Sequence, residues 1–118
     1  MQKDVLAVAV EHARAFIDGL EARPVGAQAT HAALSAALAG PLPDDGVDAA
    51  QVVDELARAV EPGLVATAGP RFFGFVIGGR LPAVLGADWL TSVWDQNASH
   101  YATSAAASVV EAVAAGWI

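Results

Sequence analysis

The sequence predicts a mostly α-helical protein of about five helices, with one extended apolar segment near residues 70–80. Apolar side chains recur at three- and four-residue steps in several stretches, which is the period of an amphipathic helix. Ser, Thr, Asp or Pro stands where several of these stretches begin, as is common at helix N-termini. The chain is 55% hydrophobic, but much of that is alanine, and it has only four Phe and three Trp. Alanine forms helices readily but adds little volume, so we expect a thin core unless the helices pack on another surface.

The first predicted helix covers residues 4–22 and is the most clearly amphipathic. Leu6, Val10, Phe16 and Leu20 fall on one face, and charged residues occupy the opposite face. Pro24, followed by Gly26, ends this helix. His12 falls on the polar face, where we expect it to be solvated.

Two further helices are predicted before residue 64. Thr30 is placed to cap a short helix that stops at Gly40-Pro41, and the stretch "GPLPDDG" then forms a turn or loop. Asp48 and Gln51 have the spacing of a capping box at the start of the next helix. The inner face of that helix is formed by Val52, Val53, Leu56 and Val60, and Pro62-Gly63 ends it.

The stretch "PRFFGFVIGGRLP" at residues 70–82 is rich in large apolar side chains and is followed by the last two predicted helices. It is too broken by glycine and proline for a long helix and too apolar for an ordinary surface loop, so we expect it to contact another surface. Pro82 fits the first turn of the fourth helix. Ser104 is placed to cap the fifth, after an irregular polar stretch "DQNASHYATS".

The charge and residue content exclude several classes of function. The net charge of −7 argues against binding to nucleic acid or to an anionic membrane surface, since both need clustered Lys and Arg. The absence of cysteine excludes disulfides and thiolate metal sites. The longest uncharged run, residues 24–43, contains Gln28, His31 and three prolines, so it does not predict a transmembrane helix. With no signal peptide visible, we expect a cytoplasmic protein.

No complete catalytic motif is present in the sequence. Gly74 and Gly79-Arg80 have the glycine spacing of a phosphate-binding loop but lack the lysine and Ser/Thr that must follow. The three histidines have no metal-ligand spacing, and Asp88 and Asp95, seven residues apart, are expected to be surface carboxylates rather than an acid–base pair. The only lysine, Lys3, lies near the N-terminus, so no buried Schiff-base lysine is expected. The chain by itself therefore does not have the residues of a complete enzyme.

Two stretches carry a resemblance to a known family. "GPRFFGFVIGGRLPAVLGADWLTSVWDQN" and "TSAAASVVEAVAAGWI" resemble the N-terminal region of the group II pyridoxal-phosphate-dependent amino-acid decarboxylases, which include the aromatic amino-acid, glutamate and tyrosine types. Ser104 and Glu111 have the seven-residue separation of the family's Ser-Pro…Glu helix, although Ala105 replaces the proline. Gly69 stands where the family often has His. The stronger likeness covers residues 70–118, and a weaker likeness covers most of the remainder.

The resemblance implies specific roles for parts of the chain. Residues 1–69 would form a helical dimerisation arm of a fold-type I pyridoxal-phosphate enzyme, and residues 70–118 a substrate-wall segment with helices that lead into an α/β cofactor domain. Phe75, Val76, Ile77 and Gly78 would line the substrate side of the pocket, and Asn97 and His100 would reach toward the partner subunit's site. The resemblance assigns no catalytic residue, cofactor ligand or metal ligand to this chain.

The cofactor domain of that family, with its Schiff-base lysine, is not part of these 118 residues. We therefore expect a segment of a longer decarboxylase of amino-acid metabolism. The complete enzyme would be a homodimer that binds pyridoxal phosphate and an amino-acid substrate, while this chain alone would bind no cofactor and be inactive. The helical pattern at the C-terminus continues to Ile118, which also suggests a longer chain. The alternative is a stand-alone, non-enzymatic helical module that binds a partner through residues 70–94.

Overall fold

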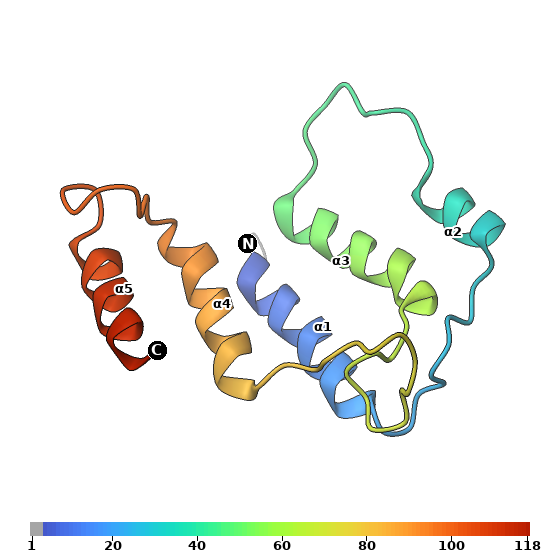
Figure 1. Cartoon of the computed structure of the whole chain (residues 1–118). Coiled ribbons are helices and arrows are strands. Elements are labelled where there is room, and N and C mark those ends of the chain that lie inside the picture. The colour runs from blue at the N-terminus through green and yellow to red at the C-terminus, as the bar shows by residue number, and fades with distance from the viewer. Residues whose placement is uncertain (1–3) are drawn as a thin grey trace. The chain divides into compact units, whose positions relative to one another are not determined.

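The computed structural model describes residues 4–118, and this part of the chain is mostly helical, with five α-helices, one short 3-10 helix and no strand. The helices are α1 (Val5–Gly19), α2 (His31–Leu38), α3 (Ala49–Val60), η1 (Glu61–Gly63), α4 (Pro82–Trp94) and α5 (Ala105–Trp117) (Figure 1). They divide into two compact units, with the boundary between Gly79 and Arg80. The mostly α-helical prediction is thus confirmed, while the functional division predicted between residues 69 and 70 stays a prediction.

The helix starts follow the capping residues found in the sequence. Thr30 Oγ1 accepts a hydrogen bond from the Ala33 N–H at 3.1 Å, and Ser104 Oγ accepts one from the Ala107 N–H at 3.2 Å. The Asp48 carboxylate accepts from the N–H groups of Ala50 and Gln51 at the start of α3. These side chains satisfy N–H groups that have no partner within the helix. Pro82 is the first residue of α4, where its missing N–H costs nothing.

The first helix ends earlier than the sequence pattern predicts. α1 stops at Gly19, whose carbonyl accepts hydrogen bonds from the N–H groups of Ala22 and Arg23 in the turn that follows. Residues 20–22 therefore belong to this turn and not to the helix. The difference is physical: Leu20 continues the apolar spacing, but glycine is a weak helix former, and Pro24 keeps the chain from resuming the helix.

The core of the first unit lies where α1 packs on α3, and α2 packs on α3 as well. Val8 of α1 and Ala50 of α3 are buried. The loop after α1 is joined by backbone hydrogen bonds to the segment after α3. Gln28 and Ala29 both donate to the Pro62 carbonyl, and Ala66, which is also buried, donates to Val25. These bonds fix the base of the segment that runs to residue 79.

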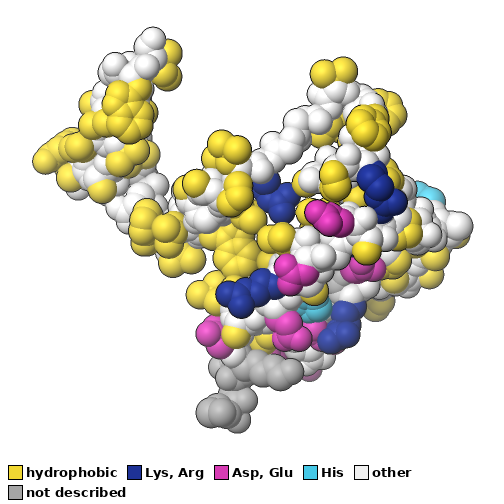
Figure 2. All heavy atoms as spheres, turned by 90° about the horizontal axis from the view of Figure 1, so that it is seen from below, with side chains coloured by type: hydrophobic (Ala, Val, Ile, Leu, Met, Phe, Trp, Pro, Cys, Tyr) yellow, Lys and Arg dark blue, Asp and Glu magenta, His cyan; other side chains and the backbone are white. Residues whose placement is uncertain are grey.

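Very little of the apolar surface is buried. Among the described residues, Val8, Ala50 and Ala66 are the only buried hydrophobic side chains. Large apolar side chains are exposed on every α-helix, and Figure 2 shows hydrophobic atoms over much of the visible surface. Scattered exposed apolar residues are normal for a soluble domain, but so small a buried set is not. The thin core expected from the alanine-rich composition is therefore observed.

The apolar segment near residues 70–80 is not extended throughout, which corrects the sequence-based prediction. A turn at Phe75 and Val76 interrupts it, and both residues have positive φ angles, 58° and 54°. The prediction failed because phenylalanine and valine strongly favour extended backbone, so their side chains give no sign of a left-handed turn.

The second unit, residues 80–118, consists of α4, α5 and the loop between them. α4 ends at Trp94, and the next residue, Asp95, adopts the left-handed conformation common at helix C-termini, with φ 45°. Over the described residues, no helix has the length and apolar character needed to cross a membrane.

Candidate functional site

The site predicted from the sequence begins at a fixed point on the first unit. Gly69 donates to the Ala66 carbonyl at 3.0 Å, and the Arg71 guanidinium donates to the Arg23 carbonyl. Arg23 is held in turn by an ion pair with Glu61 at 2.9 Å and lies 4.6 Å from the centre of the Phe16 ring. The start of the apolar segment is therefore attached to both α1 and the end of α3.

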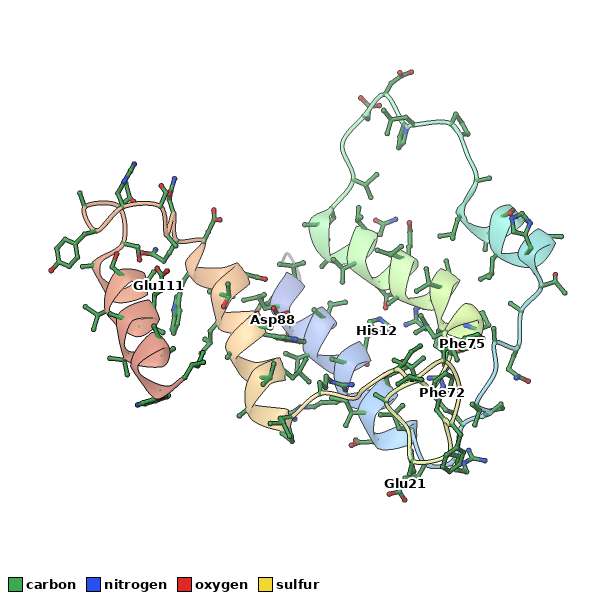
Figure 3. The ribbon with its side chains drawn as sticks, viewed as in Figure 1. His12, Glu21, Phe72, Phe75, Asp88 and Glu111 are labelled. Carbon is green, nitrogen blue, oxygen red and sulfur yellow. The ribbon has the colours of Figure 1, made fainter. Side chains whose placement is uncertain are left out.

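Phe72 is the only phenylalanine of this segment that is partly buried. A Cβ atom at Gly74 would lie 3.3 Å from the Phe72 ring, so the ring packs against the Gly74 backbone. Figure 3 labels Phe72 and Phe75 on this segment of the chain. Glycine at position 74 thus permits a close approach between the ring and the backbone.

The next apolar side chains are almost fully exposed. Phe73 is 93% exposed, Phe75 91% and Val76 104%. Phe75 and Val76 are also the two residues with positive φ in this segment, a conformation that costs about 1–3 kcal/mol for a residue other than glycine. For β-branched Val76 it is a clear outlier. Residues in sparsely populated backbone conformations cluster at functional sites.

Ile77 and Gly78 complete the predicted substrate wall and are also exposed. A Cβ atom added at Gly78 or Gly79 would meet nothing within 4 Å, and neither glycine has a positive φ. The turn in this segment lies at residues 75–76 and not at these glycines. Nothing in the described chain requires glycine at these two positions.

Asn97 and His100 lie in the second unit, in the loop between α4 and α5. The Asn97 side chain accepts hydrogen bonds from the backbone N–H and hydroxyl of Ser99, while Thr103 Oγ1 donates to the carbonyl groups of Asn97 and His100. Asn97 therefore shapes the loop through a local Asx turn. His100 is exposed. The six predicted site residues thus divide between the two units, with four in the first and two in the second.

The described residues do not fit pyridoxal phosphate. A covalent site for this cofactor needs a lysine amine, and the only lysine of the sequence, Lys3, lies outside the described residues. Residues 4–118 likewise contain no group of three metal-ligating side chains placed to hold an ion.

A polar cluster between α1 and α3 was not found from the sequence. His12 Nε2 lies 2.7 Å from Asp54 Oδ1, and Arg58 Nε donates to Asp54 Oδ2 at 2.9 Å. These two hydrogen bonds, with the Arg58 bond contributing most, lower the pKa of Asp54 from 3.8 to about 2. The expectation that His12 is simply solvated is therefore wrong. The four-residue spacing of Asp54 and Arg58 was visible in the sequence, but nothing local indicates the pairing with His12, 42 residues away.

A groove was also missed. Its volume is about 580 Å³, and it lies between the end of α2, the loop over residues 39–48 and one face of α3. In Figure 1 this loop arches from α2 to α3. The groove has apolar walls, and the charged residues that line it are all acidic: Asp44, Asp45 and Glu55. No pattern in the sequence indicates this groove, because it depends on how far the loop stands from the helices.

Comparison with known proteins finds no relative of this chain. The chain matches no protein-family model, no curated protein sequence and no solved structure.

Proposed function

We propose that this chain is the N-terminal segment of a pyridoxal-phosphate-dependent amino-acid decarboxylase. In that enzyme it supplies dimer contacts and one wall of the substrate pocket. The catalytic groups come from a cofactor domain outside these 118 residues. The enzyme is a cytoplasmic homodimer. Phe75, Val76, Ile77 and Gly78 contact the substrate side chain, and Asn97 and His100 extend toward the partner subunit's site.

The observation that carries this proposal is the exposure of the apolar segment. Phe75 and Val76 are more than nine-tenths exposed and have positive φ angles. They follow a base in which Arg71 bonds to Arg23, and Arg23 contacts Phe16 of α1 and Glu61 at the end of α3. Exposed apolar side chains next to such a base support a role in contacting a second surface. The open space around Gly78 leaves room for a ligand or another backbone.

The sequence motifs supply the second line of support. "PRFFGF", the proline-started helix after it and the Ser104–Glu111 spacing occur in the order of the decarboxylase family. Ser104 is buried and caps α5, and Glu111 lies on the same helix (Figure 3). The thin core of the chain also fits an arm that packs mainly on other parts of an enzyme.

The alternative, a stand-alone helical interaction module, rests on the same exposed surface. It differs in what the surface contacts: a separate protein instead of a cofactor domain of the same polypeptide. The two are distinguished by whether the complete reading frame that contains this sequence encodes a lysine-bearing cofactor domain.

The test is to express that complete reading frame and the 118-residue chain side by side, each with pyridoxal phosphate and a panel of amino acids. We expect CO2 release from the complete protein only. We expect the 118-residue chain to give no saturable change in cofactor absorbance, and Lys3→Ala to behave as the unaltered chain does. Lys3-dependent cofactor binding or CO2 release by the short chain would contradict the proposal. A complete frame without a cofactor domain would favour the interaction module.

A further inference from the structure

The acidic groove on the first unit has apolar walls that nothing in the described chain covers. Leu38, Val47, Val52 and Leu56 line it and are about half exposed, and Leu42 is 92% exposed. Asp44, Asp45 and Glu55 line it as well, without any lysine, arginine or histidine. A complementary occupant therefore needs an apolar side chain together with a positive charge.

The chain itself carries one stretch with that chemistry. Residues 62–87 contain no acidic residue, although the net charge of the whole chain is −7. Within this stretch Arg71 and Phe73 are two residues apart, and both are exposed. The Phe73 ring is 93% exposed and so does not pack on its own chain, unlike the neighbouring Phe72 ring.

We infer that the groove binds Arg71 and Phe73 of a second copy of this chain. The Phe73 ring enters between the apolar side chains of α2 and α3, and the Arg71 guanidinium faces Asp44 and Asp45. Arg71 already donates one hydrogen bond to the Arg23 carbonyl, which holds its side chain near the surface without neutralising its charge. A guanidinium has five N–H donors, so further donors remain for carboxylates.

This contact uses a different part of the apolar segment from the proposed substrate wall. Phe75, Val76, Ile77 and Gly78 take no part in it. The inference rests on the surface chemistry of the groove and of residues 71–73, and it does not depend on the decarboxylase proposal. Failure of one therefore leaves the other standing.

Charge reversal on the two surfaces tests the inference directly. Self-association of the 118-residue chain is measured by sedimentation equilibrium over a range of concentrations. We expect the double variant D44K/D45K to weaken association by about tenfold or more, and R71E to do the same, since each places like charges against one another. Phe73→Ala is expected to weaken association to a similar degree.

Mixing the two charge variants provides the decisive result. D44K/D45K has a basic groove and an Arg71, whereas R71E has an acidic groove and a Glu at that position. In either variant alone, the groove and residue 71 of the second copy carry charges of the same sign. In the mixture, the groove of each variant can bind residue 71 of the other variant, which carries the opposite charge. We expect the mixture to associate about as strongly as the unaltered chain, which also shows that both variants are folded.

The matched control is D18K/E21K, which makes the same change of charge at exposed residues outside the groove. It is expected to leave association unchanged apart from a weak effect of net charge. An unaltered chain that is monomeric at all concentrations would overturn the inference. So would association that is insensitive to D44K/D45K, or equally sensitive to the control, or not restored by mixing.

Discussion

Phe72 and Phe73 are adjacent in the sequence but lie in different environments. The Phe72 ring packs against Gly74 and is partly buried, while the Phe73 ring is 93% exposed. The sequence alone does not distinguish them, because both are phenylalanines in one apolar segment. What separates them is the turn at residues 75–76 and the bonded base at residues 66–71, neither of which a local pattern indicates.

This difference predicts unequal effects of truncation on stability. Phe73→Ala is expected to change the free energy of unfolding of the monomer by less than about 0.5 kcal/mol, as is usual for a surface position. Phe72→Ala is expected to cost about 1–2 kcal/mol, less than the loss for a fully buried phenylalanine. Chemical denaturation at a concentration below self-association measures both. Equal losses for the two variants would show that Phe73 is buried against its own chain.

The predicted site residues were predictable from the sequence in their residue type but not in their backbone conformation. The apolar character of Phe75, Val76 and Ile77 was visible in the sequence, and all three side chains are exposed. The strained backbone of Phe75 and Val76 was not predictable, because both residue types favour extended conformations. The role of Asn97 in shaping its own loop follows from a local Asx turn that many sequences could form.

At the scale of single elements, the helices were largely predictable because capping is local. Thr30, Asp48 and Ser104 each accept hydrogen bonds from N–H groups two or three residues ahead, so the signal and the structure lie within one turn. The pairing of α1 with α3 was not predictable in the same way. His12 and Asp54 meet only because the two helices pack together.

The His12–Asp54–Arg58 cluster predicts a pH dependence of stability. The pKa of Asp54 is lowered to about 2 by its bonds to Arg58 and His12, so its ionised form stabilises the fold. A lowered carboxyl pKa contributes stability that is fully present above its unfolded value of 3.8 and is lost as the pH falls toward about 2. Asp54→Asn is therefore expected to lower the melting temperature at about pH 6, with the difference shrinking between about pH 4 and pH 2.

Solvent screening limits how much Asp54 contributes to stability, since its side chain is 37% exposed. The side chains bonded to Asp54 are Arg58 and His12, and Glu11 also acts on Arg58. Asp18→Asn, at an exposed carboxylate on the same helix as His12, is the matched control and should show no such window. A constant difference between Asp54→Asn and the unaltered protein from pH 6 to pH 2 would contradict this explanation.

At the scale of the whole molecule, the alanine-rich composition predicted the thin core, because the volume available to fill a core depends on the overall amino-acid content and not on particular contacts. Alanine supplies much of the 55% hydrophobic content, and the buried set within residues 4–118 is correspondingly small. The groove, the turn at 75–76 and the α1–α3 cluster depend on packing between distant segments, which no local spacing encodes. The exposed apolar segment was therefore anticipated from the sequence, whereas the groove and the α1–α3 cluster were not.

The most direct test of the decarboxylase proposal is the specificity constant kcat/KM of the complete enzyme for several amino acids, before and after Ile77→Ala. Ile77 is about half exposed in this chain, so the change is expected to cost little stability. As part of the substrate wall it should alter the ratios among substrates by roughly 1–3 kcal/mol, or about 10–200-fold. Val110→Ala, at an exposed position on α5 outside the site, should leave every ratio unchanged. If Ile77→Ala also leaves every ratio unchanged, residues 75–78 do not line the substrate pocket and the proposed role of this segment is wrong.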